Sequence, residues 1–200
     1  IISSKDYQTA IVLIHNFKYS SVYETDYAPI TSRHYPRLQK KGQIAAIEIH
    51  NELLKENYIN EFNFKLIEKD SLIINNVHVM SFDNQLALSI IAKQINDDGF
   101  YYKNIALRNA YDVFLISKKT NSKIAFDKFN KLKNPLNCFL ASCFEVFNQP
   151  KSLEYNSTQK IESYLKTFNE QLNDSSVTSK GHKKIDRKVF MSKGLNIIYK

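Results

Sequence analysis

The sequence predicts an α+β protein in which strands come early and helices come late. Only 4 glycines and 4 prolines occur among the 200 residues, which favours long regular elements over a turn-rich all-β fold. Strand patterns fall within residues 1–82, whereas apolar residues three and four positions apart indicate helices over 83–172. We therefore expect an α/β part over 1–82, a helical region over 83–172, and a linker with a basic tail over 173–200.

Alternating apolar residues and turn signals locate the expected strands. A proline excludes a helix interior from the segment 31–38, so this segment is expected to be extended. After a turn at 40–42, residues 44–50 form the clearest strand, because apolar side chains alternate along it. Residues 72–80 are expected to form a hairpin, since Asn75-Asn76 tolerates the positive φ of a two-residue turn.

Helices are expected wherever apolar residues recur with helical spacing. Their approximate bounds are 5–17, 85–95, 103–118, 124–132, a segment resuming after Pro135 and ending at 147, and a last helix ending at 172. Capping side chains precede three of them: Ser3 or Ser4, then Asp83, and finally Ser157 or Thr158.

The charge balance favours anionic partners. The chain has 28 Lys+Arg against 20 Asp+Glu, and its formal net charge of +8 suits a nucleotide, a nucleic acid or an anionic surface. Frequent Lys, Asn and Ile also fit an AT-rich genome, which is the simpler explanation of the charge. No apolar run reaches the ~20 residues of a membrane span and no signal peptide is visible, so we expect a cytoplasmic protein without membrane contact.

The two cysteines are expected to be structural. Cys138 and Cys143 lie in an apolar stretch, and no second Cys/His pair stands at zinc-ligand spacing. We therefore expect buried free thiols in a reducing compartment.

Glu48 is the leading candidate for chemistry. It stands between Ile47 and Ile49 in the expected strand, and a carboxylate is costly to bury unless it binds a cation or a donor. Alternation places His50 on the same face as Glu48, where it can orient a neighbouring group. The simpler alternative is a strand whose polar face is solvated.

A second candidate group precedes this strand. His34 lies beside Arg33 and near Arg37, and together they form a small cationic group that can meet phosphate oxygens. A solvated basic surface is the simpler interpretation of the same residues.

Three blocks in this order resemble the uncharacterised nucleotidyltransferase-like family of the DNA polymerase β-type superfamily. They are Ser32 to Leu38 with Ile44 to His50, then Val77 to Asp83, then Lys103 to Asp112. The resemblance covers about residues 5–120. It implies part of a nucleotidyltransferase-type mixed sheet with flanking helices, followed by a mainly helical C-terminal part.

The resemblance also implies an activity and its site. Glu48 stands where the family has the third of three carboxylates that hold Mg²⁺, so it would be a catalytic residue and a metal ligand. Arg33, His34 and His50 would bind substrate. The expected reaction transfers a nucleoside monophosphate from an NTP to an unknown hydroxyl acceptor. The family's Gly-Ser motif and its first two carboxylates do not occur here, and Ile1-Ile2 would end the strand that carries them, so the chain alone is expected to be inactive.

The resemblance has departures, and a second function class stays open. The segment Ser89 to Gln94 lacks histidines that are common there in the family, and residues after about 150 match nothing we can name. The alternative is a non-catalytic module, such as a toxin–antitoxin or regulatory component, whose basic surface binds nucleic acid or protein.

Overall fold

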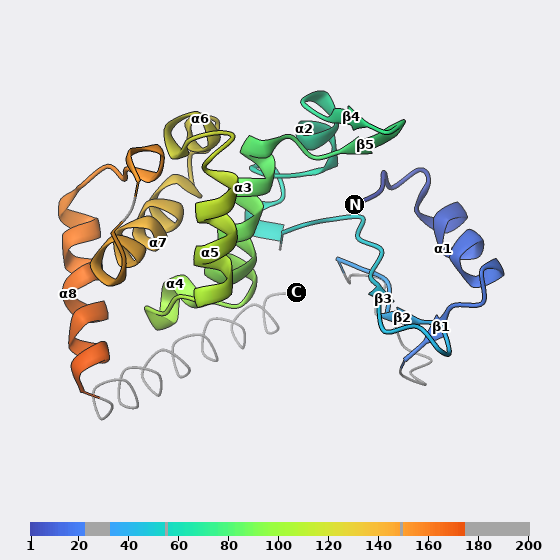
Figure 1. Ribbon diagram of the computed structural model, residues 1–200, viewed down its shortest axis with the longest axis horizontal. Coiled ribbons are helices and arrows are strands. Elements are labelled where there is room, and N and C mark those ends of the chain that lie inside the picture. The colour runs from blue at the N-terminus through green and yellow to red at the C-terminus, as the bar shows by residue number, and fades with distance from the viewer. Residues whose placement is uncertain (23–32, 55, 149, 175–200) are drawn as a thin grey trace, which may run out of the picture. The chain divides into compact units, whose positions relative to one another are not determined.

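The chain divides into two compact units, Ile1–Ser81 and Phe82–Lys200 (Figure 1). The computed structural model describes residues 1–22, 33–54, 56–148 and 150–174. Within these residues the fold is mixed α/β and helical overall: every strand lies in the first unit, and the second unit is helical. The coarse expectation of strands early and helices late is therefore confirmed. The expected boundary followed residue 82, one residue after the observed one.

The first unit begins with helix α1 (Tyr7–Asn16), inside the bounds expected from the sequence. Asp6, rather than a serine, is the residue directly before it. The hydroxyl of Ser3 donates to Asp6 Oδ2 at 2.6 Å, and the Asp6 backbone N–H donates back to Ser3 Oγ at 3.2 Å. The serine therefore acts by closing the turn that leads into the helix.

A three-stranded antiparallel sheet follows, in the order β1-β2-β3. Its strands are β1 (Ser20–Ser21), β2 (Leu38–Gln39) and β3 (Ala46–Ile47), with Leu38 opposite Ile47. The sequence predicted a longer strand over 44–50 and a mixed sheet. Ile44 is instead fully exposed next to the Lys40–Gln43 turn, and both sheets described are antiparallel.

The core of the first unit joins α1 to the sheet. Ile11, Leu38 and Ile49 are buried together. Partly buried side chains pack around them: Ile2, Tyr7, Ile14, Tyr19, Tyr35 and Ile47. Ile47 and Ile49 thus face the core, which is the alternation the sequence predicts.

The rest of the first unit is a short helix and a hairpin. After a single 3₁₀ turn (Glu56–Tyr58), helix α2 (Phe64–Lys69) begins behind Asn63, whose side chain accepts from Leu66 N–H at 3.2 Å. Sequence analysis did not anticipate α2. The predicted hairpin is confirmed as β4 (Leu72–Ile74) and β5 (Val77–Val79), with both asparagines between them at positive φ.

The second unit consists of helices around α7. Its elements are α3 (Phe82–Ile91), the π-helical turn η2 (Ala92–Asn96), α4 (Gly99–Tyr102), α5 (Leu107–Ile116), α6 (Ser122–Asp127), α7 (Lys133–Val146), the 3₁₀ turn η3 (Lys151–Leu153) and α8 (Gln159–Asn173). Figure 1 shows α3 beside α5 and α8 beside α7, and both pairs are packed together.

Most expected helices of this unit are present with shifted ends. Pro135 lies within the first turn of α7 rather than before the helix, because a first-turn N–H needs no helical partner. Asp83 lies inside α3, where the Thr120 hydroxyl donates to its carboxylate, so it is not the cap. Of the two expected caps of α8, Ser157 and Thr158, Thr158 is the one observed, and its Oγ1 accepts from Ile161 N–H at 3.3 Å.

The second unit's core is built on α7. Every residue from Pro135 to Cys143 in this helix is buried. Cys138 and Cys143 are free and buried, as expected, and burial raises the pKa of each thiol to about 12. None of the helices in the described ranges is long and apolar enough to cross a bilayer. The expected linker and basic tail beyond Asp174 lie outside the described residues.

Candidate functional site

The residues singled out in the sequence meet at one bridge between two segments of the first unit. His34 and His50 form an isolated antiparallel β-bridge. On either side of it, Tyr35 N–H donates to Ile49 O at 2.8 Å and Asn51 N–H donates to Arg33 O at 3.2 Å. The backbone therefore holds Arg33 and His34 beside His50.

Three of the four expected side chains make direct contacts there. The rings of His34 and His50 lie with their centroids 5.0 Å apart and their planes inclined by 45°. His50 Nε2 lies 3.4 Å from Glu48 Oε2, and it donates to that carboxylate. We call Arg33, His34, Glu48 and His50 the histidine-bridge cluster.

The hydrogen bond of His34 fixes its tautomer. His34 Nδ1 lies 3.0 Å from the carbonyl oxygen of Tyr35. Because a carbonyl oxygen only accepts, Nδ1 carries the proton in this bond. In the neutral ring the other nitrogen, Nε2, is then a hydrogen-bond acceptor.

Arg33 is partly committed to the backbone. Its Nη1 donates to the carbonyl oxygen of Leu53 at 3.1 Å, and its own carbonyl accepts from Asn51 and Glu52. A guanidinium has five N–H donors, so this bond orients the side chain without using all its capacity.

Glu48 is more exposed than a deeply buried metal ligand. The exposed fraction of its side chain is 46 %, and that of His50 is 28 %. A carboxylate with this exposure needs no cation to offset desolvation. The pairing with His50 accounts for its orientation.

His50 is held in its neutral form more strongly than an ordinary histidine. Burial lowers its pKa below the usual 6.5, and the neighbouring His34 lowers it further. The hydrogen bond to Glu48 and the charge of Glu48 act in the opposite direction and are the smaller effects. The ring is therefore neutral at pH 7 and offers one donor and one acceptor.

The site also contains two residues that the sequence pattern did not single out, Glu52 and His15. Glu52 Oε2 is buried and has no hydrogen-bond partner among the residues that the structure describes, and burial raises the pKa of this carboxyl. Glu52 follows Glu48 and His50 at the same two-residue spacing, which places all three on one face of an extended segment. This spacing is the sequence signal that could have identified Glu52.

His15 supports the bridge from α1. Its Nδ1 lies 3.0 Å from Tyr19 O, and its Nε2 lies 3.3 Å from the Tyr35 hydroxyl. The carbonyl fixes the proton on Nδ1, so in the neutral ring Nε2 accepts from Tyr35. The contact between His15 and Tyr35 joins residues far apart in the sequence, so no short-range pattern predicts it.

The described residues do not fit the Mg²⁺ site that the resemblance implies. Over residues 1–22, 33–54, 56–148 and 150–174, no three His, Cys, Asp or Glu side chains are grouped so as to hold a metal ion. Glu48 pairs with a histidine instead of with further carboxylates. Mg²⁺ thus stays a prediction from the resemblance, and no step is derived through it.

The chain was compared with protein-family models, curated proteins and solved structures, and none of them matches it.

Proposed function

We propose that the chain belongs to a nucleotidyltransferase-like protein and that the histidine-bridge cluster binds the phosphates of an NTP. The observation that supports this is the His34–His50 bridge, which brings the three residues expected to bind substrate, Arg33, His34 and His50, close to the expected metal ligand Glu48. The finer fold assignment is part of the same proposal: the first unit is one portion of a nucleotidyltransferase-type sheet.

The chemistry of the cluster suits a phosphate ligand. The guanidinium of Arg33 keeps unused donors, and His50 carries an N–H that faces the carboxylate of Glu48. An incoming phosphate group would favour the protonated form of His50, because an opposite charge nearby raises the pKa of a histidine. Bound phosphate would therefore oppose the burial and the charge of His34, which now keep His50 neutral.

Glu48 has a different role in the proposal. By the resemblance it is one of three carboxylates that hold Mg²⁺, which would align the acceptor oxygen and offset charge on the phosphate. No group of three side chains able to hold a metal ion is found among the described residues. The proposed reaction, transfer of a nucleoside monophosphate to an unknown hydroxyl acceptor, therefore requires the Gly-Ser motif and the two further carboxylates that the resemblance implies.

The first test is transfer of label from each α-labelled NTP in the presence of Mg²⁺. We expect transfer by the protein when the implied Gly-Ser motif and the two further carboxylates are present, and a loss of about a hundredfold or more in Glu48→Ala. The matched control is Glu68→Ala, which removes an exposed carboxylate from α2 in the same unit. Absence of transfer with every NTP, or equal activity in Glu48→Ala and Glu68→Ala, would contradict the proposal.

A second test measures NTP binding without the reaction. His34→Gln and His50→Gln should each weaken binding of an NTP to the 200-residue chain, because each removes a group that can become cationic. His78→Gln is the control, since His78 lies in the hairpin and its Nδ1 contacts Ser71 Oγ at 3.1 Å. Equal affinities in all three variants would place the nucleotide elsewhere.

A further inference from the structure

The second unit contains a cavity whose lining is rich in lysine. Its volume is about 890 Å³, within the range of ligand sites in proteins. It lies among the segment after α5, helix α6, the start of α7 and the turn η3. Its charged lining residues are Lys118, Lys119, Lys123, Lys133 and Lys151, with Asp127 and Glu154. We call it the lysine cavity.

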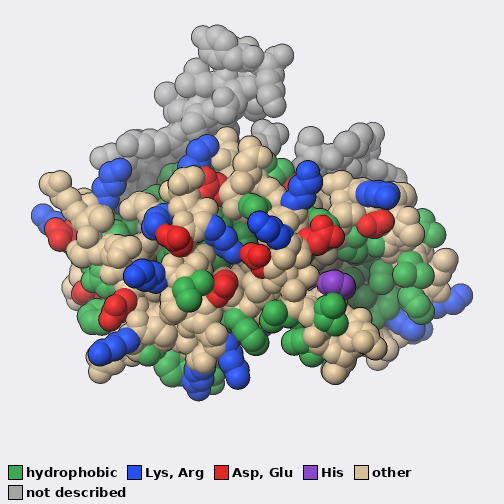
Figure 2. Space-filling view, turned by 90° about the horizontal axis from the view of Figure 1, so that it is seen from above, with side chains coloured by type: hydrophobic (Ala, Val, Ile, Leu, Met, Phe, Trp, Pro, Cys, Tyr) green, Lys and Arg blue, Asp and Glu red, His purple; other side chains and the backbone are tan. Residues whose placement is uncertain are grey.

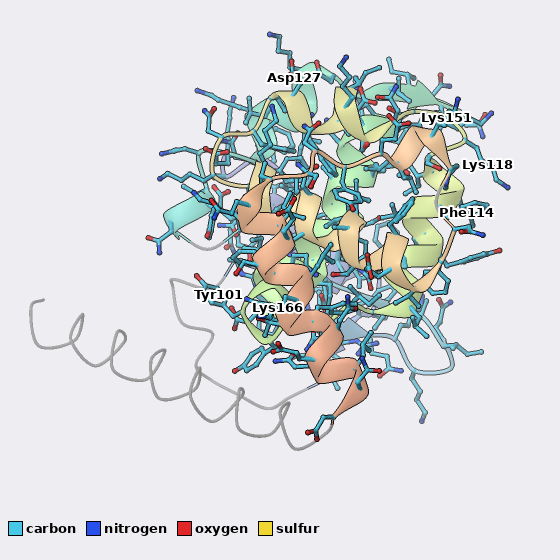
Figure 3. All side chains as sticks on the ribbon, turned by 90° about the vertical axis from the view of Figure 1, so that its left-hand side faces the viewer. Tyr101, Phe114, Lys118, Asp127, Lys151 and Lys166 are labelled. Carbon is cyan, nitrogen blue, oxygen red and sulfur yellow. The ribbon has the colours of Figure 1, made fainter. Side chains whose placement is uncertain are left out.

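Most of this positive charge has no acidic partner. Five lysines face two carboxylates, an excess of three positive charges. Lys133 Nζ lies 3.7 Å from Asp127 Oδ1, and this is the one ion pair found in the lining, all of which the structure describes. Figure 3 shows Lys118 and Lys151 on the same side of the unit, away from Lys166 on α8.

The neutral polar groups of the lining hold its shape. Ser122 Oγ donates to Glu154 O at 2.6 Å, which ties α6 to the segment after η3. Asn137 Oδ1 accepts from Asn156 N–H at 2.9 Å, which ties α7 to the same segment. Ser122 and Asn137 are therefore engaged within the fold, whereas the exposed lysines of the lining can contact a ligand.

The excess of positive charge is concentrated in the lining of one cavity. Figure 2 shows basic and acidic side chains interspersed over the face that it presents. In the lysine cavity, five basic residues from several segments surround one hollow. A hollow lined mainly by one sign of charge concentrates the field and attracts polyanions.

We propose that the lysine cavity binds the phosphate backbone of a nucleic-acid strand. Lysines neutralise phosphates as point charges, and this contact needs no particular base. An acidic protein would also be attracted, but protein partners need apolar or aromatic anchors at the centre of the interface. Phe126 is the one aromatic residue of the lining, and only 3 % of it is exposed.

The same lining predicts how the strand is recognised. Sequence-specific binding of single strands stacks bases on exposed aromatic rings, and the lining of the cavity offers none. Affinity therefore comes from phosphate contacts and falls steeply with salt, with little preference among sequences. This inference does not depend on the proposed nucleotidyl transfer, because its residues belong to the other unit.

The test compares two double variants of the 200-residue chain that lose the same charge. Lys119→Gln/Lys151→Gln removes two exposed lysines of the cavity, and Lys160→Gln/Lys166→Gln removes two exposed lysines of α8. Binding of labelled RNA and DNA strands of about 12 nucleotides is measured over a series of salt concentrations. Both variants keep the basic residues after 180, so a difference between them reports the cavity alone.

We expect a selective loss in the cavity variant. Its slope of log affinity against log salt should become shallower by about 0.7 for each lost phosphate contact, while the α8 variant keeps the original slope. Lys119→Arg/Lys151→Arg should restore binding, since it keeps both charges. The mean-residue circular dichroism of all variants should match that of the unmodified 200-residue chain, because the replaced side chains are exposed.

Three results would overturn the proposal. They are equal losses in the cavity and α8 variants, absence of binding to either strand, and inorganic triphosphate binding the cavity more tightly than the strands do. The last result would assign the cavity to a free polyphosphate. Failure of the NTP tests would not contradict this prediction, because the residues of the lysine cavity belong to the other unit.

Discussion

His34 and His50 face each other across an antiparallel bridge, with their ring centroids 5.0 Å apart. Burial lowers the pKa of His50, and the charge of the neighbouring His34 lowers it further. Glu48 offsets only part of this lowering. Folding of this unit is consequently linked to the protonation state of one ring.

The stability of the first unit should fall when the solution is acidified below about pH 6.5. The pKa of His50 in the folded state lies below its value of 6.5 in the unfolded state, so the unfolded chain takes up this proton first. The contribution of neutral His50 to the free energy of unfolding is thus present above pH 6.5, and it is lost as the pH falls through the pKa of the folded state. The midpoint of urea denaturation, measured as a function of pH, should depend less on pH in His50→Gln than in the unmodified chain. In His78→Gln the pH dependence should be unchanged.

The two cysteines should be unreactive in the folded chain. Burial raises the pKa of Cys138 and of Cys143 to about 12, so almost no thiolate forms at pH 8. A chromogenic disulfide reagent should label neither thiol in buffer and both in concentrated urea. Rapid labelling of either cysteine without denaturant would show that α7 is less buried than described.

Gly99→Ala should destabilise the second unit by roughly 1–3 kcal/mol. An added Cβ would lie 2.7 Å from the backbone oxygen of Lys93 and 3.2 Å from that of Asn104. Both atoms belong to the backbone, so neither can move aside as a side chain would. Urea denaturation measures the loss, and Ala110→Gly serves as a cavity-forming comparison because Ala110 is buried in α5.

The stability of the hairpin should depend on how well the residue at position 76 tolerates positive φ. Asn76 has φ 61°, a conformation that costs most non-glycine residues roughly 1 kcal/mol or more. Asn76→Val should therefore destabilise the hairpin by about that amount, whereas Asn76→Gly should leave it unchanged or more stable. Hydrogen exchange of the Leu72 and Val79 amides reports the hairpin directly, and equal exchange in both variants would contradict the assignment.

Local signals predicted the local structure well. The Asn75-Asn76 pair identified the hairpin, Thr158 identified the start of α8, and apolar spacing identified α1. These features depend on neighbours within a few residues, which a sequence pattern contains. The lengths of the elements were less predictable, since Ile44 had the right alternation but lies fully exposed, outside β3.

The candidate sites depended on contacts that no local pattern encodes. Alternation paired Glu48 with His50, and adjacency paired Arg33 with His34, but only the bridge between His34 and His50 shows that the two pairs are neighbours. The lysine cavity was not foreseen, because its lysines lie on several segments and the expected basic surface was assigned to the tail. Long-range packing decides which charges share a hollow, and charge composition alone does not carry that information.

Helix α7 has no outward face over most of its length, since every residue from Pro135 to Cys143 is buried. Such a segment lacks the amphipathic stripe by which a surface helix docks on one neighbour. It gains its stability only when the surrounding helices enclose it, so its amide protons should exchange with solvent through opening of the whole unit. The second unit is therefore expected to unfold as one cooperative block rather than helix by helix.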